Sequence, residues 1–136
     1  MSHLKVAIAQ IAPVWFNRAA TLTKIIDYVN QAAAQECQLV TFGEALLPGY
    51  PFWLDRTGGA EFESLRQKTI QAEYSNQAVI IERGDLQALC DAAKAGNISV
   101  SLGTIERAPD RSGHSLYCSM VYIAQSGEIK SVHRKL

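Results

Sequence analysis

Residues 41–53, TFGEALLPGYPFW, place a glutamate between an apolar run and a segment rich in proline and aromatic residues. The apolar run LVTF (39–42) is typical of a short buried strand. The segment LPGYPFWLDRTGG (47–59) contains two prolines and three glycines, and it predicts an irregular loop. Glu44 therefore stands where a strand ends and a loop begins, which is where α/β folds place functional side chains.

The periodicity around this stretch predicts alternating strands and helices. Helices are expected at 17–36 with Asn17 as the N-cap, at 60–76, and from Gly84-Asp85 to just before Gly96; strands are expected at 3–10, 39–42, 98–106, 115–124 and 127–136. A turn centred on Ser126-Gly127 predicts a hairpin of the last two strands. Ser99, Ser101 and Gly103 leave one face of their strand small, as a closely approaching layer requires. This order favours an α/β layer arrangement.

The composition narrows the class of protein. The 136 residues are 48% hydrophobic and carry a formal net charge of +0, which is typical of one soluble globular domain and offers no basic stripe for nucleic acid. The N-terminus has the pattern of neither a signal peptide nor a membrane span. Cys37, Cys90 and Cys118 are widely spaced, and no metal-ligand spacing or phosphate-binding glycine motif occurs. We expect a cytoplasmic protein without metal or cofactor, and without nucleic acid or membrane as partner.

Two charged residues are candidates for chemistry. Glu44 is either a surface carboxylate or a partly buried general base whose pKa is raised by apolar neighbours. The neighbours expected to lower the polarity around it are Phe42, Leu46, Leu47, Tyr50, Phe52 and Trp53. Lys135 closes an alternating strand and shares a face with His133, while Arg134 points to the other face. It is either a basic strand end or an ammonium that stabilises negative charge developing on a substrate.

Four separated motifs occur together in this chain: AIAQIAPVWFN (7–17), LVTFGEALLPGYPFW (39–53), SLYCSMVYIAQSGEI (115–129) and HRKL (133–136). In this order they resemble the N-terminal part of the nitrilase superfamily of carbon–nitrogen hydrolases. Within it, ALLPGYPFW resembles the nitrile-hydrolysing branch more than the amidase branch. The resemblance implies a four-layer α-β-β-α sandwich, of which residues 1–136 would be the N-terminal part of a single domain, truncated after the lysine motif.

The resemblance also implies a Glu–Lys–Cys triad. It assigns the general base to Glu44 and stabilisation of the tetrahedral intermediate to Lys135, while a thiolate attacks the nitrile or amide carbon and water later releases ammonia and the acid. Tyr50, Phe52 and Trp53 are expected either to shape the substrate pocket or, with equal weight, to anchor the long loop. The substrate would be a small nitrile or amide, and the full-length form a homo-oligomer.

This chain departs from the family pattern at three points. Gly43 stands where the family usually has proline, which leaves the orientation of Glu44 less fixed. Cys118 stands where the family often has asparagine, which removes an amide near the site. The family's nucleophilic cysteine lies beyond HRKL. Among the cysteines present, we expect Cys37 to be a packing or surface residue, Cys90 to be a small buried thiol, and Cys118 to lie in the core with nothing beside it to form a thiolate.

The chain alone is therefore expected to be inactive, because acid–base groups do not replace the attacking atom. Three alternatives stay open beside the nitrilase interpretation. The first is an amidase-type carbon–nitrogen hydrolase. The second is a noncatalytic remnant that pairs with itself or with a full-length homologue. The third is a module that binds a small molecule without chemistry.

Overall fold

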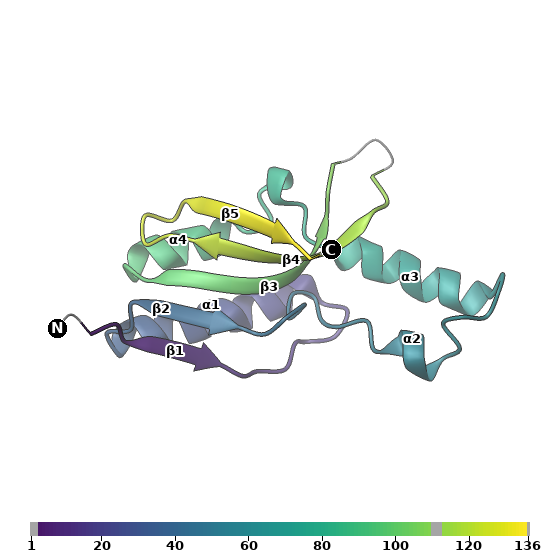
Figure 1. Cartoon of the computed structure of the whole chain (residues 1–136), viewed down its shortest axis with the longest axis horizontal. Helices are drawn as coiled ribbons and strands as arrows, with labels where there is room; N and C mark the ends of the chain where they lie inside the picture. The colour runs from purple at the N-terminus through teal and green to yellow at the C-terminus, as the bar shows by residue number, and fades with distance from the viewer. Residues whose placement is uncertain (1–2, 110–112, 136) are drawn as a thin grey trace.

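A computed structural model describes residues 3–109 and 113–135, which form a five-stranded sheet with helices packed on it (Figure 1). The strands are β1 Val6–Ala9, β2 Leu39–Phe42, β3 Ser99–Arg107, β4 Leu116–Ile123 and β5 Ile129–Arg134. The helices are α1 Arg18–Ala34, α2 Trp53–Arg56, α3 Leu65–Gln77 and α4 Gln87–Ala95, with a 3₁₀ turn η1 at Ile81–Arg83. None of these described helices is both long and apolar enough to cross a membrane.

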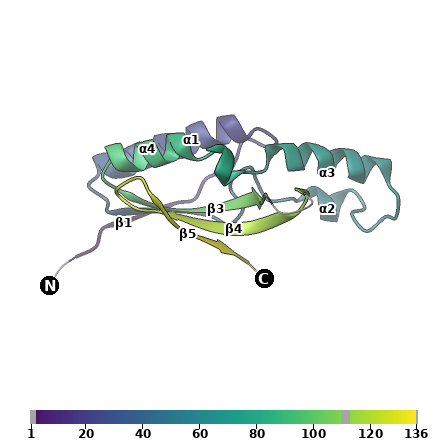
Figure 2. The same cartoon turned by 90° about the horizontal axis from the view of Figure 1, so that it is seen from above.

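The sheet is mixed, and its strands follow chain order from β1 to β5. The pairs β1–β2 and β2–β3 are parallel, whereas β3–β4 and β4–β5 are antiparallel. The hairpin turn forms where it was predicted, with the amide of Gly127 donating to the carbonyl of Ala124 at 2.8 Å. Figure 2 shows α1, α3 and α4 on one side of the sheet and no described helix over its other side. The α/β prediction is confirmed, and the described chain forms two of the four expected layers.

Local signals explain most helix boundaries. The side chain of Asn17 accepts a hydrogen bond from the amide of Ala20 at 2.9 Å, so the predicted N-cap of α1 is confirmed. The helix predicted to open at Gly84-Asp85 instead begins at Gln87. Gly84 has φ +84° and ends η1, a left-handed conformation that cannot continue into a right-handed helix.

Two boundaries in the middle of the chain differ from prediction. The irregular loop at 47–59 contains the short helix α2, and the helix predicted at 60–76 begins only at Leu65. Glu63 has φ +57°, and this left-handed residue separates the 60–64 segment from α3. The helix α2 ends with the C-cap Thr57, whose amide donates a hydrogen bond to the carbonyl of Trp53 at 2.9 Å.

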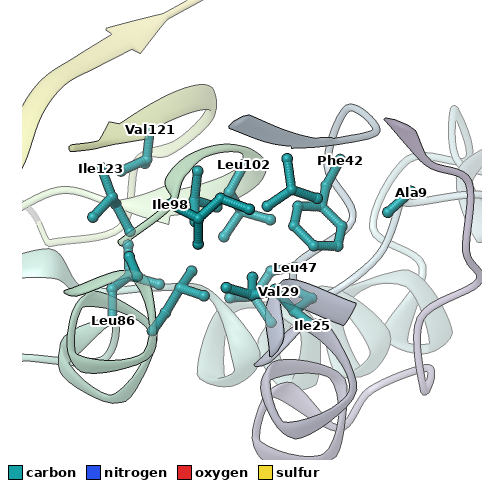
Figure 3. Packing of buried hydrophobic residues seen from close by; sticks show 14 of the residues in the cluster. Ala9, Ile25, Val29, Phe42, Leu47, Leu86, Ile98, Leu102, Val121 and Ile123 are labelled. Carbon is teal, nitrogen blue, oxygen red and sulfur yellow. The ribbon is translucent and has the colours of Figure 1, made fainter. Parts of the chain in front are cut away.

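The main core lies between the sheet and helices α1 and α4 (Figure 3). Residues from β2, β3 and β4 point toward both helices, and the strand residues labelled in the figure include Phe42, Leu102, Val121 and Ile123. They meet Ile25 and Val29 of α1 and Leu86 at the start of α4. Cys37 and Cys90 belong to this cluster, at 8% and 6% exposure, which confirms the buried thiol predicted for Cys90 and makes Cys37 a packing residue and not a surface one. Burial of this kind contributes about 25 cal/mol per Å² of apolar surface, and it fixes the sheet against the helices.

The opposite face of the sheet is open in the described chain. Alternation in β1 turns Ala9 toward the helices and leaves Ile8 82% exposed on the open face. The register continues this face across the sheet, from Ile8 to Thr41 and on to Ser101. Small residues on these central strands leave the backbone accessible to other parts of the chain, and the candidate site lies here.

Candidate active site

Glu44 lies on a turn at residues 43–46, called the Glu44 bulge below, that packs against the central strand β3. A Cβ atom added at Gly103 would stand 2.3 Å from the carbonyl oxygen of Gly43 and 2.6 Å from the Cα of Glu44. The bulge turns at Ala45, which has φ +53° and is buried, and the chain then rejoins β3 through a hydrogen bond from the amide of Leu47 to the carbonyl of Gly103. The expectation that β3 is small because a layer approaches it is confirmed at Gly103.

Lys135 directly follows β5, an edge strand of the sheet, and its side chain reaches Glu44. Its amide donates to the carbonyl of Cys118 at 2.8 Å, which continues the pairing of β4 and β5 by one step. Its ammonium donates to Glu44 Oε1 at 2.8 Å, across a separation of 91 residues. The fold therefore brings together the two residues that the sequence singled out for chemistry.

The ion pair sets the protonation of both groups. The hydrogen bond from Lys135 lowers the pKa of Glu44, a second hydrogen bond from Cys118 and the charge of Lys135 lower it further, and Glu44 in turn raises the pKa of Lys135. The prediction that apolar neighbours raise the pKa of Glu44 is wrong. Its side chain is 54% exposed, because Leu46 and Leu47 pack into the core and do not cover the carboxylate.

Cys118 is a third member of this group; it was predicted to lie in the core, and it is a partly buried residue packed against the second hydrophobic cluster, that of Ala45, Trp53, Tyr74, Ala78 and Ile105. Alternation along β4 buries Ser119, Val121 and Ile123, so Cys118 lies on the open face and is only partly buried. Its Sγ lies 3.3 Å from Glu44 Oε1 and donates a hydrogen bond to it. Burial, this hydrogen bond and the Glu44 charge raise the pKa of the Cys118 thiol, whereas Lys135 lowers it. The thiol is therefore protonated at neutral pH.

These three side chains border a cleft of about 320 Å³ on the open face of the sheet. Strands β2 to β5 all contribute to its walls, and the other lining residues include Thr41, Phe42, Ser101, Met120 and His133. A cleft of this size fits a small organic molecule. Among the described residues, no cluster of three or more His, Cys, Asp or Glu side chains could hold a metal ion.

An ion pair that the sequence interpretation missed, between the buried Glu106 carboxylate and the exposed Arg134, holds the end of β5. Glu106 is 2% exposed, and its carboxylate accepts two hydrogen bonds from Arg134, at 2.9 Å from Nε and 2.8 Å from Nη2, and one from Ser119 Oγ at 2.7 Å. These contacts lower the pKa of Glu106, with the Arg134 hydrogen bond as the largest cause. The Arg134 guanidinium also lies 4.3 Å from the ring centroid of Tyr117. The pair anchors the residue directly before Lys135.

The aromatic residues after Glu44 take different positions. Tyr50 is 57% exposed, and its phenol lies near enough to Lys135 to contribute to the raised pKa of that ammonium. Phe52 packs edge-on against Trp15 at 4.6 Å between ring centroids. Trp53 is buried, with Tyr74 at 4.4 Å and Phe16 at 5.4 Å. None of Tyr50, Phe52 and Trp53 is among the residues lining the cleft, so their contact with substrate stays a prediction.

Known proteins resemble this chain in sequence and in fold. Residues 5–136 match the carbon-nitrogen hydrolase family. The chain belongs to that family. It is 37% identical over 134 residues to "Nitrilase 2" from an unknown prokaryotic organism, covering 98% of this chain and 41% of that protein. It is 35% identical over 136 residues to an aliphatic nitrilase of Rhodococcus rhodochrous, covering 97% of this chain and 34% of that protein.

A solved structure shows the same fold. An amidase from Nesterenkonia sp. aligns with a TM-score of 0.67 at 18% identity, over 98% of this chain and 43% of the amidase. The resemblance to the nitrilase superfamily is thus confirmed in both sequence and fold. This carbon–nitrogen hydrolase chain spans between about a third and two fifths of the length of the nitrilases named above.

We expect Gly103→Ala to disturb the Glu44 bulge. The added methyl group would meet backbone atoms of Gly43 and Glu44, which cannot rotate away as a side chain could. Overpacking of this kind lowers the free energy of unfolding by about 1–3 kcal/mol, to be measured by urea denaturation. Gly43→Ala is the matched control, because a Cβ there meets nothing within 4 Å. Equal stability of the two variants would contradict the close approach.

Proposed function

We propose that a protein containing this chain hydrolyses the carbon–nitrogen bond of a small nitrile, giving a carboxylic acid and ammonia. The observation that carries the proposal is the 2.8 Å contact between Lys135 Nζ and Glu44 Oε1 at the edge of the cleft. The carboxylate and the ammonium are held together on the open face of the sheet. They can therefore supply a proton acceptor and a positive charge to the same carbon–nitrogen group of a substrate. Membership of the carbon-nitrogen hydrolase family supports this assignment.

Each residue has a distinct chemical role in this proposal. The Glu44 carboxylate takes the proton from an attacking thiol as it adds to the nitrile carbon. It then takes a proton from a first water, which converts the thioimidate to a thioester with loss of ammonia, and from a second water, which hydrolyses the thioester to the acid. The Lys135 ammonium stabilises the negative charge that develops on the substrate nitrogen or oxygen as the carbon becomes tetrahedral. The Glu106–Arg134 pair keeps the Lys135 backbone in place while this charge develops.

The attacking thiol of turnover is proposed to come from outside these 136 residues. Cys37 and Cys90 are buried in the core between the sheet and the helices, away from the cleft. We propose that residues 1–136 form the N-terminal part of a single hydrolase domain and that the rest of the domain closes over the open sheet face. The share of the named nitrilases that the chain covers is in keeping with this arrangement.

A nitrile is the first choice of substrate because the relatives with the greatest identity quoted above are nitrilases. An amide is the second choice, since the Nesterenkonia protein of the same fold is an amidase. Both substrates present an electrophilic carbon bonded to nitrogen, so Glu44 and Lys135 would serve either. The cleft walls in this chain do not separate the two.

The proposal is tested by ammonia release from a panel of nitriles and amides. The 136-residue chain is compared with a protein extended through its natural downstream reading frame. We expect the extended protein to release ammonia from nitriles faster than from the matched amides, and the short chain to release none. Faster turnover of amides would favour an amidase, whereas two folded but inactive proteins would favour a noncatalytic or binding role.

A further inference from the structure

The thiol of Cys118 lies beside a carboxylate that can accept its proton, and the function proposed above does not use it. It is partly exposed and borders the cleft, whereas Cys37 and Cys90 are buried. Its S–H donates to Glu44 Oε1 at 3.3 Å, the same oxygen that Lys135 Nζ contacts at 2.8 Å. A thiol, a carboxylate and an ammonium thus converge on one atom beside a cavity, all within this chain.

We propose that Cys118 is a covalent attachment site for small uncharged carbon electrophiles, haloacetamides in particular, with Glu44 accepting the thiol proton. This inference rests on the role proposed above for Glu44 as a base. The cleft admits a molecule of this size directly beside the sulfur atom. Lys135 also lines the cleft, so its ammonium is available to donate to the carbonyl oxygen of an amide placed there.

The step balances with chloroacetamide as the electrophile. The Cys118 sulfur attacks the CH₂ carbon, a C–S bond forms, and the C–Cl bond breaks with its electron pair leaving as chloride. The S–H proton moves to Glu44 Oε1 and then to solvent, which restores the carboxylate. The product is a stable thioether, and no oxidant or reductant takes part.

The charges around the thiol make this route distinguishable from ordinary thiol alkylation. Burial and Glu44 raise the pKa of the Cys118 thiol, and Lys135 lowers it. If the reaction proceeded through a thiolate already present, removal of the Glu44 charge would increase the thiolate fraction and speed the reaction. If Glu44 takes the proton during attack, the same change slows it.

The experiment measures modification of the 136-residue chain by chloroacetamide at neutral pH, with peptide mass spectrometry to follow each cysteine. We expect Cys118 to react about tenfold or more faster than the buried Cys37 and Cys90, which act as internal controls. We expect Glu44→Gln to slow the reaction of Cys118 by about tenfold or more. Glu128→Gln is the matched control, because Glu128 pairs with Lys130 on an exposed turn outside the cleft and should leave the rate unchanged.

Equal modification of all three cysteines in the wild-type chain would overturn the proposal without reference to any variant. Unchanged or faster modification in Glu44→Gln would also overturn it. The two proposals fail separately. If Glu44→Gln abolishes ammonia release by the extended protein but not modification of Cys118, only the attachment site is refuted. If modification behaves as expected while the extended protein hydrolyses nothing, only the proposed function is refuted.

Discussion

Replacing Glu44 by glutamine is expected to lower kcat/KM for ammonia release by about 10²–10⁴-fold in the extended protein. Glutamine keeps the size of the side chain and an oxygen that can accept from Lys135, but it cannot take up a proton. The carboxylate is 54% exposed, so the change should leave the fold intact. The measurement is steady-state kinetics on the best nitrile of the panel, with circular dichroism to confirm folding.

The pH profile separates a catalytic base from a structural carboxylate. Lys135 lowers the pKa of Glu44, so the carboxylate stays ionised and the wild-type rate is retained as pH falls below the usual glutamate range. Lys135→Met removes this effect, and the acid limb of its residual kcat/KM should move to higher pH. Glu128→Gln again serves as the control, with unchanged kinetics. An activity of Glu44→Gln close to wild type would refute the role of Glu44 as base.

Replacing Trp53 by alanine is expected to have the largest effect on stability, a loss of about 3–5 kcal/mol in the free energy of unfolding. Trp53 is 3% exposed and packs against Tyr74, Phe16 and Ala45 in a cluster separate from the main core. Ala45 directly follows Glu44 and belongs to the same cluster as Trp53, so loss of the indole removes packing beside the Glu44 bulge. The measurement is urea denaturation of the 136-residue chain.

Trp53→Phe is the matched control for this prediction. It keeps an aromatic ring in the cluster and removes the indole Nε1–H, which is buried and has no hydrogen-bond partner among the described residues. Removing an N–H that makes no hydrogen bond costs little free energy of unfolding. This variant should therefore be destabilised much less than Trp53→Ala. A raised KM in Trp53→Ala with wild-type stability would instead support the pocket-wall role predicted for Trp53.

Local signals in the sequence were sufficient for much of the fold. Asn17 caps α1 because its side chain bonds within its own turn, and Gly127 closes the hairpin through a neighbouring carbonyl. These interactions span only a few residues, so the sequence pattern reports them directly. The helix start after Gly84 was mispredicted, since the same residue type can open a helix or end a turn in the left-handed region.

The site was predicted only in part. Glu44 and Lys135 were chosen from a strand end, an alternating pattern and a family resemblance, and the fold places them 2.8 Å apart. The partnership of Glu106 with Arg134 was not predicted, although a carboxylate at the end of the otherwise uncharged segment 98–106 was the signal for it. Cys118 was predicted to lie in the core and is only partly buried; the pattern did not reveal this because β4 has apolar or small residues on both sides.

The sequence by itself determined the alternation of strands and helices, the residue types at the strand ends and the family to which the chain belongs. Tertiary structure alone decided which of those residues meet. The contact between Glu44 and Lys135 spans 91 residues, and it depends on the order of the strands and on the close approach that Gly103 allows. It also reversed the predicted pKa shift of Glu44, because proton affinity depends on the charges and solvent that surround a carboxylate in space, not on its neighbours in the chain.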